Sequence, residues 1–133
     1  MDHARKPLVV IVEDEPLVRF VAREGLVDAG YAVLEARDAA EAIALISARP
    51  DVCVLFTDVN MPGDLDGLSL AELVHARWPA IRLLVTSGRP LDRAVPDHGE
   101  FLGKPYTIVE LTRALEASAS ESSKTGTCAP PRR

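Results

Sequence analysis

Short apolar runs rich in valine alternate with helical stretches along most of this chain. Leu8–Val12 is the first run, and further strands are predicted over Tyr31–Glu35, Val52–Thr57, Ile81–Thr86 and Glu100–Leu102. A run that is apolar at every position is typical of a strand buried on both faces. Strands of this kind that alternate with helices form a parallel sheet covered by helices on both sides. The sequence therefore predicts an α/β fold with a doubly wound, five-stranded parallel sheet.

The helical stretches carry recognisable ends. Pro16 opens the first helix, in which Leu17, Phe20, Val21 and Val27 recur at roughly helical spacing, and Gly30 suits a left-handed C-terminal cap. Asp38 with Glu41, and Thr107 with Glu110, have the spacing of capping boxes. Another helix follows Gly67 and ends at Trp78-Pro79. Arg89–Gly99 contains prolines and no apolar period, so we expect a loop there with at most one helical turn.

Bulk properties predict one globular domain over residues 7–117, followed by a disordered tail over 118–133 that is rich in Ser, Thr and Pro. The net charge of -5 argues against a nucleic-acid surface, which needs a basic face. No apolar stretch approaches the ~20 residues of a membrane helix, and no signal peptide precedes the first strand. We therefore expect a cytoplasmic protein, and its two cysteines do not suggest a disulfide framework.

Acidic side chains follow two of the predicted strands. Glu13-Asp14-Glu15 comes after the first strand and Asp58 after the third, so their carboxylates meet at one edge of a parallel sheet. Carboxylates that lie this close repel one another unless a cation neutralises them. Mg²⁺ suits the set, with Asp14 and Asp58 as carboxylate ligands, the Asn60 backbone carbonyl as a third ligand and Glu13 binding through water. Alternatively, Glu13–Glu15 is an acidic cluster favoured by the helix dipole.

Three further residues complete a candidate phosphoryl site. Asp58 is the candidate nucleophile, which would form an acyl phosphate. A hydroxyl at the end of the fourth strand, from either Ser87 or Thr86, could donate to a phosphoryl oxygen, because side-chain alternation admits only one of the two. Lys104 would neutralise phosphate charge.

Other metal and nucleotide sites are not indicated. Pro62 and Ser69 break the EF-hand pattern that Asp58-Val59-Asn60 would begin. The three histidines, His3, His75 and His98, have no zinc-ligand spacing. Neither a P-loop nor a glycine-rich dinucleotide motif is present in the sequence.

Taken together, these residues resemble the receiver domain of two-component response regulators, the chemotaxis-regulator-like fold, over about Pro7 to Ala117. The resemblance rests on Glu13-Asp14, Asp58 in Asp-x-x-Met-Pro, Asp66-Gly67, Ser87-Gly88 and Lys104-Pro105. It implies the strand order 2-1-3-4-5 and Mg²⁺-dependent phosphorylation of Asp58 by a sensor histidine kinase or a phosphotransfer protein. It also implies that Ser87 and Lys104 contact the phosphate, and that the domain has self-phosphorylating and self-dephosphorylating activity. Most X-Pro bonds are trans, so a cis Lys104-Pro105 bond is expected only because the resemblance implies it.

The chain departs from the family pattern in three places. The loop Met61–Gly67 is one residue longer than usual, the fourth helix is short or absent, and only a tail follows the last helix. If the chain is complete, it resembles a stand-alone receiver that acts on an unknown downstream protein or passes phosphate onward, with a homodimer left open. The other interpretation is a receiver excised from a larger kinase. One alternative is a degenerate receiver that binds a partner without phosphorylation. A haloacid-dehalogenase-type phosphatase is disfavoured, because Asn60 stands where that site needs a second aspartate.

Overall fold

The computed structural model describes residues 7–96 and 99–123, with side chains to residue 117. Its central feature is a five-stranded parallel sheet in the order β2-β1-β3-β4-β5, which confirms the predicted fold class. The strands are β1 (Leu8–Val12), β2 (Ala32–Ala36), β3 (Val52–Asp58), β4 (Arg82–Ser87) and β5 (Glu100–Gly103). The boundaries of β2 and β4 lie one residue later than predicted, so Ser87 belongs to β4. β3 extends to Asp58.

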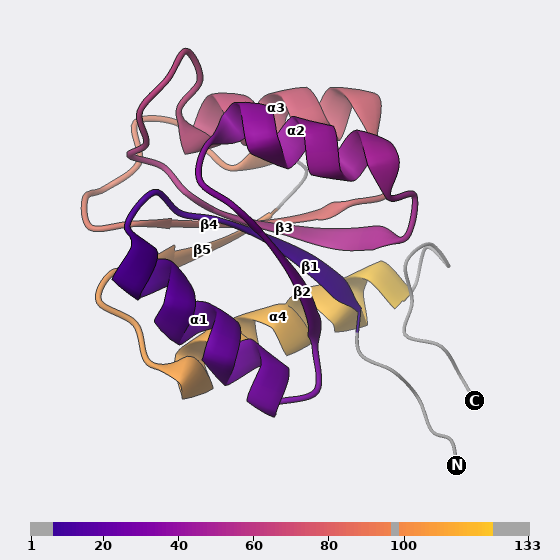
Figure 1. The fold of residues 1–133 in the computed structure, drawn as a ribbon, viewed down its shortest axis with the longest axis vertical. Helices are drawn as coiled ribbons and strands as arrows, with labels where there is room; N and C mark the ends of the chain where they lie inside the picture. The colour runs from indigo at the N-terminus through magenta and orange to yellow at the C-terminus, as the bar shows by residue number, and fades with distance from the viewer. Residues whose placement is uncertain (1–6, 97–98, 124–133) are drawn as a thin grey trace.

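Helices cover both faces of this sheet (Figure 1). They are α1 (Pro16–Asp28), α2 (Ala39–Ala48), α3 (Gly67–Arg77) and α4 (Ile108–Ser123). The pair α1 and α4 lies on one face, and the pair α2 and α3 lies on the other (Figure 1). No helix in the described part of the chain is long and apolar enough to cross a membrane.

Strand residues alternate between two cores, one under each pair of helices. Val10 and Val12 belong to the core under α2 and α3, whereas Val9 and Ile11 belong to the core under α1 and α4. All five side chains of β1 are buried, as the apolar run predicted. The period of two within each strand therefore decides which residues beyond a strand end lie on which face of the sheet.

The helix ends agree with the predicted caps. Asp38 accepts a hydrogen bond from the backbone N–H of Glu41 (2.9 Å). Thr107 and Glu110 form both arms of a capping box: the Thr107 N–H donates to the Glu110 carboxylate (2.8 Å), and the Glu110 N–H donates to the Thr107 hydroxyl (3.1 Å). Gly30, just past α1, has φ 99°, which an L side chain rarely adopts.

Helix α4 continues to Ser123, past the domain boundary predicted at Ala117. The serine-rich composition suggested a tail, but the alanines and glutamates mixed among these serines are compatible with helix, so the backbone extends α4. The disorder predicted for the rest of the tail falls on residues 124–133, which lie outside the described residues.

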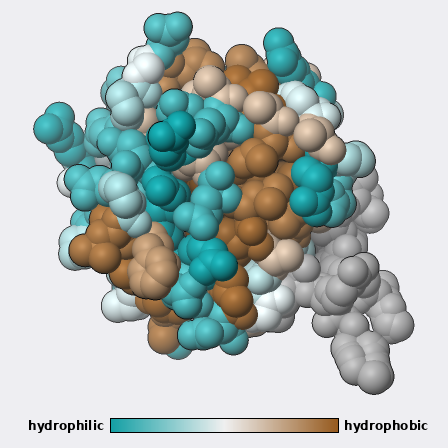
Figure 2. Space-filling view, viewed as in Figure 1, coloured by the Kyte–Doolittle hydropathy of each residue, from teal (hydrophilic) through white to brown (hydrophobic). Residues whose placement is uncertain are grey.

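The apolar residues of α1 divide into two stripes. Ala22 and Leu26 are buried, whereas Leu17, Phe20 and Val21 are between 51% and 72% exposed. Apolar residues at helical spacing usually mark the buried stripe, but here a different pair, Ala22 and Leu26, faces the sheet. Figure 2 shows hydrophobic side chains among hydrophilic ones on the part of this face that α1 forms. Helix α1 therefore carries a second, outward apolar surface.

Gly25 of α1 lies close to Ile108 of α4, and we expect Gly25→Ala to destabilise the protein. A Cβ there would lie 2.4 Å from Ile108 Cδ1 and 2.9 Å from Ile108 Cγ2. Alanine in a helix normally increases stability by about 1 kcal/mol relative to glycine. Overpacking against a stiff β-branched side chain decreases stability by about 1–3 kcal/mol. In urea unfolding, Gly25→Ala should lower the free energy of unfolding of the wild type. The same change in an Ile108→Ala background should raise it. A gain in the wild-type background would contradict this packing.

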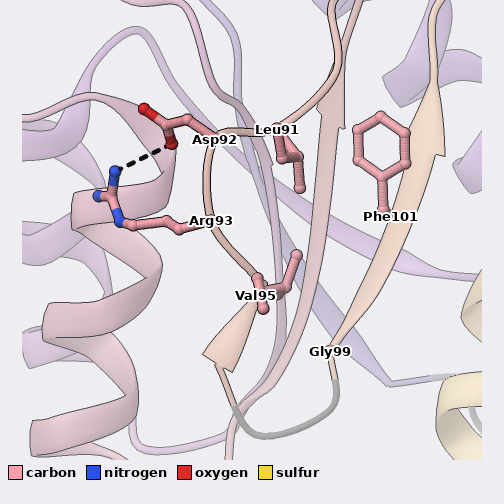
Figure 3. A pocket seen from close by; sticks show the side chains of 7 residues that line it. Leu91, Asp92, Arg93, Val95, Gly99 and Phe101 are labelled. Carbon is pink, nitrogen blue, oxygen red and sulfur yellow. Dashed lines mark hydrogen bonds and ion pairs between the residues drawn. The ribbon is translucent and has the colours of Figure 1, made fainter.

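No α-helix occurs between β4 and β5 in the residues described there, where only Pro96 has 3₁₀ conformation; this agrees with the loop of at most one helical turn predicted for Arg89–Gly99. Leu91 and Val95 of this loop pack against the core under α2 and α3. Arg93 points away from them to α3 (Figure 3), where it donates to the carboxylate of Glu72 (2.7 Å). Leu91 and Val95 also line a groove beside β5 with Phe101, which is 44% exposed. Phe101 is therefore a surface residue and not a core residue.

Candidate functional site

The carboxyl ends of β1, β3 and β4 bring the predicted site residues together. Glu13 and Asp58 continue the alternation of Ile11 and Phe56, both of which belong to the core under α1 and α4. Their side chains are consequently directed to the same side of the sheet edge. The cis peptide before Pro105, which the sequence analysis anticipated, lies beside Lys104 in the turn after β5.

Three carboxylates and one ammonium converge there. Glu13, Asp14 and Asp58 each offer a carboxylate oxygen, and these oxygens lie within 4.8 Å of one another. Lys104 Nζ is 3.1 Å from Glu13 Oε1 and 3.3 Å from Asp58 Oδ2. Glu13 and Asp58 are buried, with 4% and 5% of their surface exposed, whereas Asp14 is exposed. Asp14 is therefore the member of the cluster that faces solvent.

Glu13 is held by hydrogen bonds at every polar atom. Its Oε2 accepts from the N–H of Glu15 (3.1 Å) and its Oε1 from Lys104. Its N–H donates to the Ala36 carbonyl (3.0 Å), and its own carbonyl accepts from Arg19 NH1 (2.8 Å). With both oxygens of Glu13 occupied, Asp14 and Asp58 are the carboxylates best placed to coordinate a cation directly. That Glu13 contributes through water stays a prediction.

Burial and charge act on these groups in opposite directions. Burial raises the pKa of Glu13, with a further contribution from the Asp58 charge, although the Glu15 N–H and Lys104 oppose the shift. Burial also lowers the pKa of Lys104, but its hydrogen bond to Glu13 and the charge of Asp58 outweigh burial and raise that pKa overall. Lys104 therefore remains an ammonium and is the cation of the metal-free site.

Tyr106 lies beneath the cluster. Its ring packs edge-on against Phe56, with 5.8 Å between the ring centroids. Burial, followed by the charge of Glu13, raises the pKa of Tyr106 to about 12. Tyr106 is therefore a neutral apolar support for the site at physiological pH.

The two candidate hydroxyls at the end of β4 lie in different environments. Thr86 is the register partner of Asp58, and its Oγ1 is buried without a hydrogen-bond partner among the described residues. The Ser87 Oγ accepts from the N–H of Arg89 (3.0 Å), at the start of the loop that stands in for a helix. The alternation that directs Glu13 and Asp58 to the α1 and α4 side places Thr86, which follows Leu84, on that same side, and Ser87, which follows Val85, on the other. Thr86 is therefore the better placed of the two hydroxyls to reach Asp58.

Gly67 lies against the backbone of Asp58. Its N–H donates to the Val59 carbonyl (2.8 Å), and a Cβ at Gly67 would lie 2.0 Å from the Asp58 carbonyl oxygen. Only glycine fits this approach. The neighbouring Asp66 caps α3 by accepting from the Ser69 N–H (2.8 Å). The Asp66-Gly67 pair thus sets the position of α3 against the end of β3.

Asn60 occupies the loop that follows Asp58. Its N–H lies 3.4 Å from Asp58 Oδ1, a long hydrogen bond that orients the carboxylate towards this loop. The Asn60 carbonyl was predicted as a metal ligand, and this stays a prediction.

Sequence analysis missed Arg19 and Glu35. Arg19 donates to the Glu13 carbonyl and also forms an ion pair with Glu35 of β2 (3.1 Å). A signal was available, because the helix dipole disfavours a cation near the start of a helix, so Arg19 needed an acidic partner. The sequence alone could not show which acidic residue that was.

Comparison with known proteins agrees with this geometry. The family model "Response regulator receiver domain" matches residues 9–116. The chain belongs to this family. Among receiver proteins, it is 32% identical over 122 residues to the DNA-binding transcriptional regulator NtrC of Escherichia coli K12, covering 87% of this chain and 25% of that protein. The chain thus spans about a quarter of the length of this curated relative.

Solved receiver structures share the fold. The chemotaxis protein CheY4 of Vibrio cholerae superposes with a TM-score of 0.77 at 26% identity, over 85% of this chain and 98% of that one. The receiver domain of the hybrid histidine kinase CckA superposes with a TM-score of 0.72 at 32% identity, over 84% and 97% of the two chains. The likeness therefore extends over almost the whole of both solved domains.

The residues present fit a hard divalent cation. Carboxylate oxygens from β1 and β3 are the ligands that Mg²⁺ prefers, and the solvent-facing position of Asp14 leaves room for the waters that Mg²⁺ retains. The acidic cluster of this receiver domain is therefore compatible in chemistry with Mg²⁺.

Proposed function

We propose that this receiver domain is a phospho-acceptor switch that takes a phosphoryl group onto Asp58. The observation that carries the proposal is the contact of Lys104 Nζ with both Glu13 and Asp58, in a cluster that also includes Asp14. An uncompensated set of buried carboxylates would be costly, so the arrangement is best explained by a role that needs cations there. The family membership of the chain supports the same role.

In this proposal Asp58 attacks the phosphorus of a phosphohistidine on a sensor histidine kinase or a phosphotransfer protein. The new O–P bond forms as the N–P bond breaks, and the electron pair of that bond stays on the histidine nitrogen. Mg²⁺ bound to Asp14, Asp58 and the Asn60 carbonyl would neutralise charge on the phosphoryl oxygens. Lys104 moves its ammonium to a phosphoryl oxygen, and the buried Thr86 hydroxyl, which has no hydrogen-bond partner among the described residues, donates to another.

The outward apolar surface of α1 supports a protein as the phosphoryl donor. Leu17 and Val21 line a pocket with Lys104, Pro105 and Tyr106, so this surface borders the site directly. Apolar surface of this kind, next to a reactive centre, is typical of a docking site for another protein. We propose that the donor protein binds here.

A receiver that binds a partner without phosphorylation remains the second candidate. The observations that favour it are Glu13, where the family more commonly has aspartate, and the loop between β4 and β5 in place of a helix. Both features alter the surroundings of Asp58, yet Asp14, Asp58 and Lys104 are all in place. We therefore rank it second.

The test is the intact mass of the protein after incubation with acetyl phosphate, with and without Mg²⁺. We expect a phosphoryl adduct on the wild type that requires Mg²⁺ and is absent from Asp58→Asn. Thr86→Ala should slow formation of the adduct by about tenfold or more, because a transition-state hydrogen bond is lost. Thr86→Ser retains the buried hydroxyl and serves as the matched control. Absence of any adduct on the wild type would favour the phosphorylation-independent module.

A further inference from the structure

We propose that Arg19 is a positioning residue that fixes the loop after β1 for cation binding, acting together with Glu35. This inference rests on the proposed function, since it concerns the same metal site. Arg19 touches no group that a phosphoryl donor would meet. Its contact is with the backbone carbonyl of Glu13, one residue before the solvent-facing ligand Asp14.

The geometry makes Arg19 a bridge between three elements. Its NH1 donates to the Glu13 carbonyl at the end of β1 (2.8 Å), and its Nε donates to Glu35 Oε1 on β2 (3.1 Å). The residue itself belongs to α1. Only 17% of its side chain is exposed, and its contact with the Glu13 carbonyl is partly buried, whereas its contact with Glu35 lies at the surface. The planar fork of a guanidinium is what allows two separate acceptors to be held at once.

A second link joins β2 to the same residue. The Glu13 N–H donates to the carbonyl of Ala36, the residue after Glu35. Both backbone groups of Glu13 are thus linked to β2. Its N–H binds the Ala36 carbonyl directly, and its carbonyl is linked to Glu35 through Arg19. The direction in which Asp14 leaves the strand is set by these two contacts, because α1 begins only two residues later at Pro16. No side-chain hydrogen bond caps the start of α1. The loop before α1 is therefore constrained by Arg19 and not by an N-cap side chain.

Positioning and simple electrostatics predict opposite effects on metal binding. Arg19 is a cation near an acidic cluster that would bind another cation, so removal of its charge alone should strengthen Mg²⁺ binding. If Arg19 acts by holding the loop, loss of its two-way contact should weaken Mg²⁺ binding. Arg19→Lys separates the two effects, since it retains the charge but cannot bond to Glu13 and Glu35 through a rigid fork.

Arg23 offers a matched control on the same helix. It is one turn along α1 and forms an ion pair with the other oxygen of Glu35, Oε2 (3.1 Å). Arg23 also pairs with its neighbour Glu24. None of its contacts is with the β1–α1 loop. Arg23→Lys therefore perturbs the same carboxylate and the same helix while leaving the Glu13 carbonyl bound.

The experiment is a calorimetric titration with MgCl₂, which measures the Kd for Mg²⁺. It is carried out on the metal-free wild type, Arg19→Lys and Arg23→Lys. We expect Arg19→Lys to raise the Kd for Mg²⁺ about tenfold, a typical effect of losing an outer-shell contact, and Arg23→Lys to leave it within about twofold of wild type. With acetyl phosphate as the donor, the phosphorylation rate of Arg19→Lys should return to the wild-type rate at saturating Mg²⁺. Thermal unfolding without Mg²⁺ should show a similar decrease in the Tm of both variants.

Two outcomes would overturn the inference while leaving the proposed function standing. One is an unchanged Mg²⁺ affinity in Arg19→Lys, which would make the contact with Glu13 irrelevant to the site. The other is an equal loss of affinity in both variants, which would trace the effect to general weakening of α1. If the wild type itself bound no Mg²⁺, the proposed function and this inference would fail together.

Discussion

Gly67→Ala is expected to destabilise the protein and to disable Asp58 at the same time. The added Cβ would lie 2.0 Å from the Asp58 carbonyl oxygen and 2.8 Å from Val59 Cα, and these backbone atoms belong to the end of the central strand β3. Since neither a rotamer change nor a flexible side chain can relieve the contact, either β3 or the start of α3 must move. We expect a loss of about 3 kcal/mol in the free energy of unfolding, the upper range for overpacking.

The measurements are urea unfolding and the acetyl phosphate assay on the same sample. Phosphorylation of the folded fraction should fall at least tenfold, because a displaced Asp58 carboxylate no longer lies beside Lys104. Gly88→Ala is the control at the same edge of the sheet: the only contact of its Cβ is with Lys104 Cβ at 4.0 Å, so stability should change little. Wild-type stability in Gly67→Ala would mean that α3 is held less closely to β3 than described.

The sheet and the acidic cluster could be predicted because they depend on local patterns. A run such as Leu8–Val12, apolar at every position, has few structural solutions, and residues just after parallel strands necessarily share one edge. Glu13, Asp58 and Lys104 were therefore brought together on topology alone. Capping boxes such as Thr107 with Glu110 are equally local, since both partners lie within one turn of helix.

The remaining features depend on packing between distant segments. Helical spacing in α1 identifies two apolar stripes but does not say which one faces the sheet, and Ala22 and Leu26 are the buried residues. Packing between the helices determines the orientation of α1, because α1 lies close to Ile108 at Gly25. Arg93 finds Glu72 across twenty-one positions of sequence, and Arg19 finds Glu35 across sixteen, so no short-range pattern could pair them.

The loop between β4 and β5 links the proposed phosphoryl site to a surface. The Ser87 hydroxyl holds the Arg89 N–H at the start of this loop, and Leu91 and Val95 farther along line the groove that ends at Phe101. A phosphoryl oxygen that draws Thr86, the residue before Ser87, towards Asp58 would therefore pull on the loop and change this groove. Since Arg93 ties the loop to Glu72 of α3, a shift there would reach α3 as well.

Lys104→Ala is expected to destabilise the metal-free protein in a way that depends on pH. The substitution removes the ammonium that lies 3.1 Å from Glu13 and 3.3 Å from Asp58, and both carboxylates are buried. Loss of one partner of a buried ion pair leaves the other charge uncompensated. Because 25% of the Lys104 side chain is exposed, we expect a loss of about 2 kcal/mol at pH 8, less than for a fully buried pair.

The sign of the pH dependence follows from Glu13. Its pKa is already raised in the folded protein by burial, and loss of Lys104 removes contributions that lower it, so the pKa rises further in the variant. A carboxyl group with a raised pKa takes up a proton more readily in the folded than in the unfolded state. The deficit of Lys104→Ala should consequently be full at pH 8 and shrink as the pH falls through the raised pKa of Glu13.

Urea unfolding of wild type and Lys104→Ala at pH 8 and pH 5, with and without Mg²⁺, measures this deficit. Addition of Mg²⁺ at pH 8 should restore most of the stability, because the cation replaces the ammonium among the carboxylates, while the response of the protein to phosphorylation stays weakened. Arg93→Ala, which breaks an exposed ion pair with Glu72, should leave the free energy of unfolding close to that of the wild type at either pH. An equal deficit for Lys104→Ala at both pH values would assign the effect to packing of its aliphatic stem and not to charge.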